Sequence, residues 1–479
     1  MIRYSLKIIL ATLLFGCFAI STAAQGQLEL KSQSHVLFGT GGNLPFWLHS
    51  NKYGIYDKEG SNLLQSFSFQ KGLAHNKLID YGFGVDVVGR LSANENILFN
   101  ELYGEAKVGF IELYAGKKKW SDGIWSSGLS LGSLIWSGNT ATMPKIMIRI
   151  PEYVPVPYTN RYLSFRGYLG HGWFGDNRYV EGTYLHEKAL YLRLLQEEFP
   201  VNGHIGIIHN VQWAGKHPTL GDLPDSFGDY LRIFSGRAGE ANTSPGGEVI
   251  NALGNTVGAY EARLDVDLRN IDISAYRQFF IETSVSTRLR SPWDGQWGLK
   301  LQMDELTSNF ITTLLWEHLN TKEQNAKTGE TIGADQYYHN FIYSNGWSYK
   351  SRILGSPLVQ LGPVNDRLEV VNNIILAHHL GLEGSFSTSI SRWPLKYQLK
   401  TTYSRSYGRT SNCGGDFCDE NDPQPLRTER KDQWYHQLKL TQKINKNLSL
   451  NTMIGIDKGE LSDETGFMLG VTYSILNKE

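Results

Sequence analysis

The stretch Tyr260-Glu261-Ala262-Arg263-Leu264-Asp265-Val266-Asp267-Leu268 alternates apolar and polar side chains without a break. In a β-strand, neighbouring side chains point to opposite faces of the sheet. The apolar face of this strand carries Tyr260, Ala262, Leu264, Val266 and Leu268, and the polar face carries Glu261, Arg263, Asp265 and Asp267. Segments of this kind, each about ten residues long, follow one another to the C-terminus and predict an antiparallel transmembrane β-barrel with a wet interior.

The same alternation, followed towards the N-terminus, predicts a barrel of about 18 strands. The expected strands are residues 28–38, 63–70, 81–91, 98–108, 110–116, 129–135, 145–150, 162–170, 203–213, 257–268, 271–280, 297–303, 306–318, 373–388, 395–407, 434–442, 448–457 and 466–476. Residues 184–195 fit neither the strand period nor the helix period well.

The lengths of the connections give the barrel an orientation. Bacterial barrels have an even number of strands, short periplasmic turns and longer outer loops, and we place both termini in the periplasm. Long connections then fall outside, at residues 214–256, 319–372 and 408–431. Short turns fall in the periplasm, at residues 269–270, 304–305 and 443–447.

One segment, residues 225–234, has helical rather than strand spacing. Phe227, Tyr230, Leu231 and Phe234 recur at that spacing, with Asp225 as the expected cap and Gly236 as the expected end. We expect this helix to pack against or inside the barrel mouth as a small plug element.

The N-terminus has the pattern of a secretory signal. Arg3 and Lys7 precede an apolar run over residues 8–20, and small residues follow at 21–24. A membrane anchor and a lipoprotein signal through Cys17 are weaker alternatives. An exported chain without a long apolar helix can enter a bilayer only as a closed barrel, because every backbone amide there needs a partner.

The composition agrees with a single barrel. The 479 residues include 25 Tyr, 21 Phe, 12 Trp and 50 Gly, and no linker or charge block divides them. The mean hydropathy of −0.31 is too polar for a helical membrane protein, whereas half of each barrel strand faces water. The net charge of −1 argues against a nucleic-acid partner. We therefore expect residues 1–24 to form the signal peptide and residues 25–479 the barrel.

Two cysteines lie beyond the signal, in Cys413-Gly-Gly-Asp-Phe-Cys418. An oxidising compartment and a glycine-rich loop favour a disulfide between Cys413 and Cys418. A zinc site is the alternative, but two thiols lack the remaining ligands of a tetrahedral site. We expect no metal and no other cofactor.

An ordered set of motifs resembles the Wzi family of capsule-assembly outer-membrane proteins. The motifs are Pro45-Phe46-Trp47-Leu48 with Asn51-Lys52-Tyr53-Gly54, Ile150-Pro151-Glu152-Tyr153-Val154-Pro155-Val156-Pro157, His171-Gly172-Trp173-Phe174-Gly175-Asp176, Leu185-His186-Glu187-Lys188, Gly346-Trp347-Ser348-Tyr349-Lys350 and Gly355-Ser356-Pro357-Leu358. The resemblance spans about residues 36 to 390. It implies an 18-stranded outer-membrane barrel, plugged by helices, that acts as a lectin and holds capsular polysaccharide without catalysis. The chain departs from many such barrels in ending Leu476-Asn477-Lys478-Glu479 rather than on an aromatic residue.

The long connection over residues 319–372 is the best candidate for sugar contact. It is rich in aromatic rings, which suit the C–H faces of sugars, and in amides and cations, which suit hydroxyl pairs. The predicted polysaccharide-binding residues are Tyr337, Tyr338, Asn340, Tyr343, Asn345, Trp347, Tyr349, Lys350 and Arg352. The alternative is that these aromatics belong to the interface girdle or pack the loop against the rim.

Three functions remain open from the sequence. The first is an outer-membrane lectin that anchors capsular or other exported polysaccharide, with membrane lipid and other capsule-export components as further partners and a monomer as the expected state. The second is a general porin or sugar channel, which requires an open lumen. The third is an envelope hydrolase, but no nucleophile elbow, His-Glu-x-x-His motif or phosphate-binding loop occurs.

Overall fold

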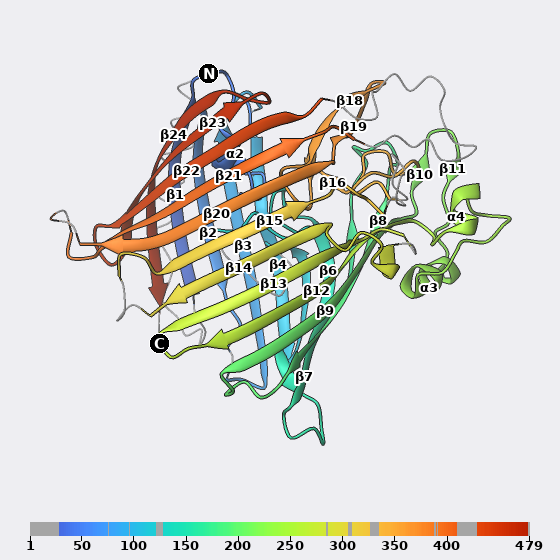
Figure 1. Cartoon of the computed structure of the whole chain (residues 1–479), viewed down its shortest axis with the longest axis horizontal. Coiled ribbons are helices and arrows are strands. Elements are labelled where there is room, and N and C mark those ends of the chain that lie inside the picture. The colour runs from blue at the N-terminus through green and yellow to red at the C-terminus, as the bar shows by residue number, and fades with distance from the viewer. Residues whose placement is uncertain are drawn as a thin grey trace.

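The computed structural model describes residues 28–477, apart from residues 75, 95, 121–127, 284–285, 305–308, 326–334, 388, 390 and 410–428. The expected antiparallel barrel is confirmed as one closed sheet of 18 strands (Figure 1). Its strands are β1 (Leu28–Gly39), β2 (Asn62–Lys71), β3 (Ile79–Leu91), β4 (Asn96–Val108), β5 (Ile111–Lys117), β6 (Pro144–Pro155), β7 (Leu163–Trp173), β8 (Tyr184–Leu194), β9 (Val201–Trp213), β12 (Asn255–Asp267), β13 (Ile271–Ile281), β14 (Gly295–Met303), β15 (Thr313–Asn320), β20 (Ile375–Phe386), β21 (Leu395–Ser406), β22 (Lys431–Lys443), β23 (Leu448–Gly459) and β24 (Glu464–Asn477).

Short elements occupy the connections between these strands. They are α2 (Phe46–His49), β10 (Lys216–His217), β11 (Gly221–Asp222), α3 (Phe227–Ser235), α4 (Gly246–Ile250), a 3₁₀ turn at Ser286–Arg288, β16 (Ser348–Tyr349), β17 (Arg352–Ile353), β18 (Gln360–Val364) and β19 (Arg367–Asn372). No helix of the described part of the chain is long and apolar enough to cross a membrane.

The first and last strands close the ring. β1 pairs with β2 along one edge and with β24 along the other, from Leu28 opposite Asn477 to Gly39 opposite Gly466. A sheet edge in lipid would leave a row of backbone groups without partners. The pairing of β1 with β24 supplies those partners.

The two faces of each strand separate as the alternation predicts. On β24, the outward side chains Phe467, Leu469, Val471, Tyr473 and Ile475 are exposed, and Met468 between them is buried. On β12, Leu264 is exposed on the outside, whereas Glu261 is buried on the lumen side. The barrel is therefore apolar outside and polar inside.

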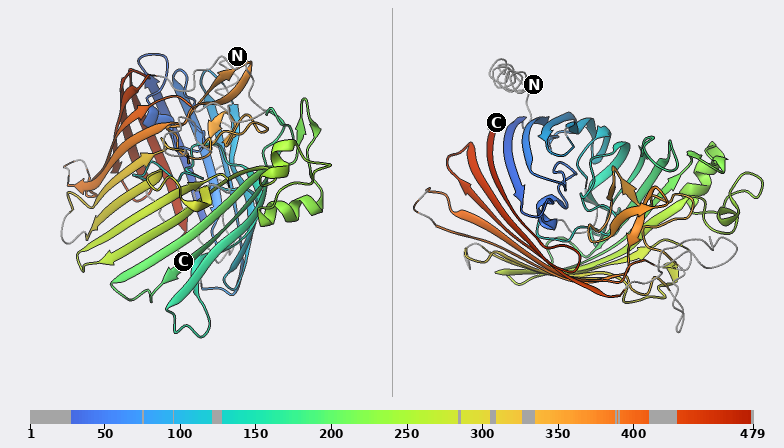
Figure 2. Two further views of the ribbon diagram at one scale, coloured as in Figure 1. Left: turned by 45° about the vertical axis from the view of Figure 1, so that its right-hand side comes forward. Right: turned by 90° about the horizontal axis from the view of Figure 1, so that it is seen from above.

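The connections sort by length between the two ends of the barrel. The connections over residues 40–61, 118–143, 214–254 and 321–374 lie at one end, here called the loop end, and the connections over residues 109–110, 195–200, 268–270 and 444–447 lie at the other, the turn end (Figures 1 and 2). The expected sorting of long and short connections is present, and the placement of the loop end outside the cell stays a prediction. The turn expected at residues 304–305 is longer, because the strand expected at 306–318 pairs only from Thr313 onwards.

The predicted strand at residues 129–135 is wrong, and the ambiguous segment 184–195 takes its place as β8. Residues 129–135 fold into the lumen, where side chains of the barrel wall bind them. The buried carboxylate of Glu317 on β15 accepts hydrogen bonds from the Ser130 hydroxyl (2.6 Å) and the Leu131 amide (2.7 Å). The amide of Leu134 donates to the side chain of Gln278 on β13 (2.6 Å). Lumen side chains thus replace the ladder that a strand would need.

The helix expected at residues 225–234 is present as α3, but its predicted place as a plug is wrong. Ser226, not Asp225, caps it with a capping box, and Gly236 ends it in the left-handed conformation at φ 65°. α3 lies on the outer side of the wall, beside β8 and β9 (Figure 1). Among the described residues, the α-helix that lies within the ring is the short α2 (Figure 2).

Replacing Glu317 by Ala should release residues 129–135 from the wall. The substitution leaves the buried donors of Ser130 and Leu131 without a partner, at a cost of about 1–3 kcal/mol for each group. We expect amide hydrogen exchange in this segment to become about a hundredfold faster, measured by mass spectrometry.

The matched control is Glu383→Ala, which removes another lumen carboxylate, one that accepts from Gln398 on β21. Equal protection of residues 129–135 in the wild-type chain and the Glu317→Ala variant would contradict the anchoring role of Glu317.

Candidate functional site

Connections from the loop end fold into the lumen and form an apolar core in the half of the barrel nearer that end. Trp47 of the β1–β2 connection, Trp136 of the β5–β6 connection and Trp347 of the β15–β20 connection belong to one buried cluster. The rings of Trp136 and Trp347 meet edge to face at 5.4 Å. Because Trp buries a large apolar area, this core holds segments together that are far apart in the sequence.

Two indole N–H groups of this core have polar partners. Trp47 Nε1 donates to the Thr402 hydroxyl on β21 (3.1 Å), and Trp347 Nε1 donates to the Ile135 carbonyl (2.9 Å). The Lys400 ammonium lies 4.3 Å from the Trp47 ring centroid, a cation–π distance. The wall therefore fixes α2 in one position and orients the residues beside it.

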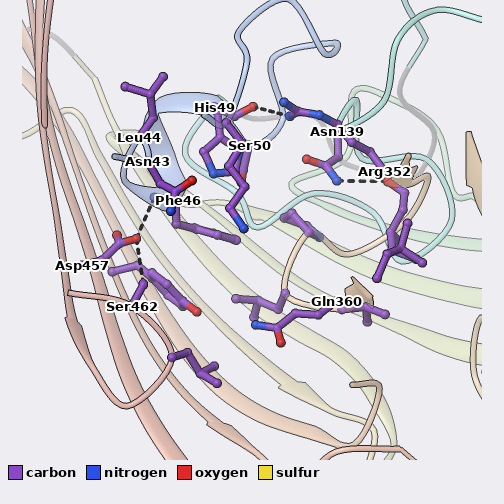
Figure 3. Close-up of a pocket in the computed structure, with 18 of the residues that line it drawn as sticks. Asn43, Leu44, Phe46, His49, Ser50, Asn139, Arg352, Gln360, Asp457 and Ser462 are labelled. Carbon is purple, nitrogen blue, oxygen red and sulfur yellow. Dashed lines mark hydrogen bonds between the residues drawn. The ribbon is translucent and has the colours of Figure 1, made fainter. Parts of the chain in front are cut away.

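A polar cavity of about 500 Å³ lies next to α2 at the loop end (Figure 3). It forms where residues 43–58, residues 351–368 and the ends of β22, β23 and β24 meet. The side chains that the following argument uses are Phe46, His49, Arg352, Tyr435, Asp457 and Glu464. It lies among the longer connections, at the end of the barrel that we expect to face away from the cell.

One wall of the cavity is aromatic. Phe46 on α2 and Tyr435 on β22 stack with ring centroids 4.4 Å apart and planes 29° apart. Phe46 is only partly buried, whereas Tyr435 is 5% exposed. The pair therefore offers the ring of Phe46 as an apolar surface and supports it from behind with Tyr435.

The carboxyl groups of Asp457 and Glu464 supply a polar part of the cavity lining. Asp457 Oδ2 accepts hydrogen bonds from the Phe46 amide (2.9 Å) and the Ser462 hydroxyl (3.1 Å) (Figure 3). Within the described structure, Asp457 Oδ1, Glu464 Oε2 and His49 Nδ1 are buried and have no hydrogen-bond partner. Buried polar atoms are costly to leave unpaired, so these atoms are the natural partners for a polar ligand.

Arg352 joins two sides of the cavity. Its guanidinium donates to the carbonyls of His49 (3.0 Å) and Tyr56 (2.6 Å). Burial lowers the pKa of Arg352 to about 10, so the group stays charged at pH 7. Burial and the charges of Arg352 and Lys58 hold the pKa of His49 well below its usual value, so that imidazole is neutral at pH 7.

The structure separates the residues predicted to bind sugar. The five aromatics are buried, at 5% exposure or less: Tyr337, Tyr338, Tyr343, Trp347 and Tyr349. Stacking on a sugar needs an open ring face, and these rings instead pack the inward-folded loop. Their part in sugar binding stays a prediction, and in this conformation their observed role is packing.

The polar members of that set have different surroundings. Asn340 Oδ1 accepts from the amides of Ile342 and Tyr343, and Asn345 bonds the Tyr179 amide and the Leu368 carbonyl. Both amides thus serve the loop. Lys350 is exposed. Of the residues predicted to bind sugar, Arg352 lines the cavity together with Phe46 and Asp457.

Phe46, Tyr435, Asp457 and Glu464 were not predicted as site residues. Phe46 lies in the Pro45–Leu48 motif, which carries part of the family resemblance, so this signal was present in the sequence. Asp457 and Glu464 flank a short connection and look like ordinary strand ends. The prediction of a Cys413–Cys418 disulfide and that of the signal peptide fall outside the described residues.

A metal centre finds no support in the described part of the chain, where no group of three or more His, Cys, Asp or Glu side chains could hold an ion. The site thus consists of an aromatic surface, hydrogen-bond acceptors and a fixed cation. Such a set suits reversible binding of a polyhydroxylated ligand.

Comparisons with known proteins agree on the architecture. A family model described as "Capsule assembly protein Wzi" matches residues 47–465. A solved structure of Wzi from Escherichia coli, described as an outer-membrane, carbohydrate-binding β-barrel involved in group 1 capsule assembly, is 14% identical. Its TM-score is 0.56, over 92% of this chain and 83% of that one. No curated protein matches the sequence.

More distant barrels also match. OccK5 (OpdH) of Pseudomonas aeruginosa is 11% identical, with a TM-score of 0.47 over 95% of this chain and 98% of that one. OccAB4 of Acinetobacter baumannii is 9% identical, with a TM-score of 0.46 over 95% and 98%. Neither likeness is close enough to support a function.

The packing of the lumen near the loop end predicts a low ion conductance. Because the connections bury an apolar core inside the ring, we expect the purified protein to add no steady conductance to a planar bilayer. A general porin in the same bilayer is the control. Regular ionic steps from the folded protein would contradict this account and favour the channel alternative.

Proposed function

This chain belongs to the Wzi family of capsule assembly proteins, and we propose that it acts as a lectin that holds surface polysaccharide at the cavity beside α2. It is an outer-membrane β-barrel, and the cavity opens among its outer connections. Wzi of Escherichia coli is described as a carbohydrate-binding barrel. The proposal transfers that class of ligand to the site described above.

The observation that carries the proposal is the pairing of an aromatic face with unpaired acceptors in one cavity. The Phe46 ring, supported by Tyr435, suits the C–H face of a sugar ring. Asp457 Oδ1 and Glu464 Oε2 suit the hydroxyl groups at its edge. A sugar hydroxyl that donates to an otherwise unpaired, buried oxygen removes the cost of leaving that oxygen without a partner.

The proposed role is binding rather than catalysis. Asp457 already accepts two hydrogen bonds through Oδ2, which fixes its carboxylate in place. A fixed carboxylate suits recognition of a repeated sugar unit, and many weak units along one polymer add up through multivalency. The porin alternative would use the lumen, which the apolar core occupies at this end.

Deleting the gene should release polysaccharide into the medium while its synthesis continues. Antibody or dye against the surface polymer measures the cell-bound fraction, and the medium is assayed in parallel. Polymer that stays on the deletion strain in normal amount would reject the anchoring function.

Two substitutions test the cavity itself. Phe46→Leu keeps apolar volume but removes the ring, and Asp457→Asn keeps the shape but replaces one acceptor by a donor. We expect each to weaken binding of the strain's purified surface polysaccharide about tenfold, since about 1.4 kcal/mol is lost. Titration calorimetry on the folded protein measures it.

Phe341→Ala is the control, because Phe341 is an exposed aromatic of a loop-end connection, β15–β20, and does not line the cavity. Unchanged affinity in both cavity variants would place the sugar elsewhere. Heat-modifiable migration in gels verifies that each variant is folded.

A further inference from the structure

The helix α3 is attached to the outer surface of the barrel. On β8, Glu187 faces the lumen and pairs with Lys145, so the neighbouring His186 and Lys188 face outwards. The Lys188 ammonium donates to the Phe234 carbonyl of α3. The His186 ring lies 5.6 Å from that of Phe234. These contacts place α3 against the outward face of the wall.

Apolar contacts hold α3 there. Ile233 is 1% exposed and packs in one cluster with Val211 and Trp213 of β9 and with Leu253. The Tyr230 ring lies 5.9 Å from that of Trp213. With its capping box and its left-handed Gly236, α3 is a well-defined helix rather than a loose loop.

A second apolar side of α3 is largely exposed, although one edge of it, the Phe234 ring, meets His186 and the Lys188 ammonium (4.0 Å to the ring centroid) on the wall. Phe227, Leu231 and Phe234 lie on one side of the helix and are 76%, 52% and 43% exposed. Gly228, Arg232 and Ser235 occupy a more polar side. Thus one side of α3 packs on the barrel, one side is apolar and exposed, and one side is polar.

The surroundings of α3 identify what covers the apolar side. Leu190 on β8 and Ile205 and Ile207 on β9 are exposed on the outside of the same strands, nearer the turn end. This is the face that lipid solvates in an outer-membrane barrel. α3 lies at the loop end of these strands (Figure 1), and therefore borders the lipid-facing band.

We propose that α3 is an interfacial helix, which lies in the outer leaflet of the outer membrane with Phe227, Leu231 and Phe234 among the lipid acyl chains. Helices with a strong apolar side and a polar side settle at the boundary between head groups and acyl chains. The helix widens the membrane contact of the barrel beside β8 and β9. It also fixes the height at which the loop end, and the cavity within it, stands above the membrane.

A site-specific label tests this placement. In a background with Cys17, Cys413 and Cys418 replaced by Ser, a fluorophore is attached at Leu231→Cys or, as the matched control, at Ser235→Cys one turn away on the polar side. The full protein is placed in phosphatidylcholine nanodiscs, one copy per disc, with or without lipids that carry a nitroxide near the head group. Heat-modifiable migration verifies folding in both variants.

We expect nitroxide lipids to quench the label at position 231 about twofold or more strongly than the label at position 235. Equal quenching at both positions, or none at either, would overturn the proposal. If a second copy covers this side of α3 instead, lipid would not quench the label at position 231, and the unlabelled Leu231→Cys variant would cross-link between copies in detergent. This result would also overturn the proposal.

Discussion

Lipid accepts no backbone hydrogen bonds, and this constraint determines the rest of the structure. Each strand must pair on both edges, so the chain has to form a ring, and the contact of β1 with β24 completes it. The ring then fixes a polar inner face, because the alternation that gives lipid its apolar side chains leaves the other half inside. The connections that fold into the lumen are built on that inner face, whereas α3 packs on the outer one.

The polar inner face also binds the connections that fold into the lumen. Glu317 and Gln278 bind backbone amides of residues 129–135, and the His379 ring bonds the Leu129 carbonyl at 2.6 Å. Once these amides are satisfied, the connection can bring its apolar side chains into the lumen and pack them on Trp47 and Trp347. The cavity beside α2 is a consequence, since α2 stands where the inward connections meet the ends of β22–β24.

Much of the barrel could be predicted from the sequence, because period-two alternation is a local signal. It located β12 and β24 closely, and it predicted that long and short connections sort to opposite ends of the barrel. The prediction failed at residues 129–135, which alternate like a strand but are bound by side chains from distant strands. It failed for α3 in location only, because helical spacing does not say which partner the helix packs on. The aromatics of residues 337–349 illustrate a third limit: composition cannot distinguish a ring that meets a ligand from one that a folded connection buries.

The most direct measurement for the central claim is a cryo-electron microscopy map of the protein in nanodiscs with oligosaccharides cut from its own surface polymer. The account predicts sugar density in the cavity, with a ring against Phe46 and a hydroxyl close to Asp457 Oδ1. Density that lies only outside this cavity, along the outer surface of the connections or deep in the lumen, would contradict it.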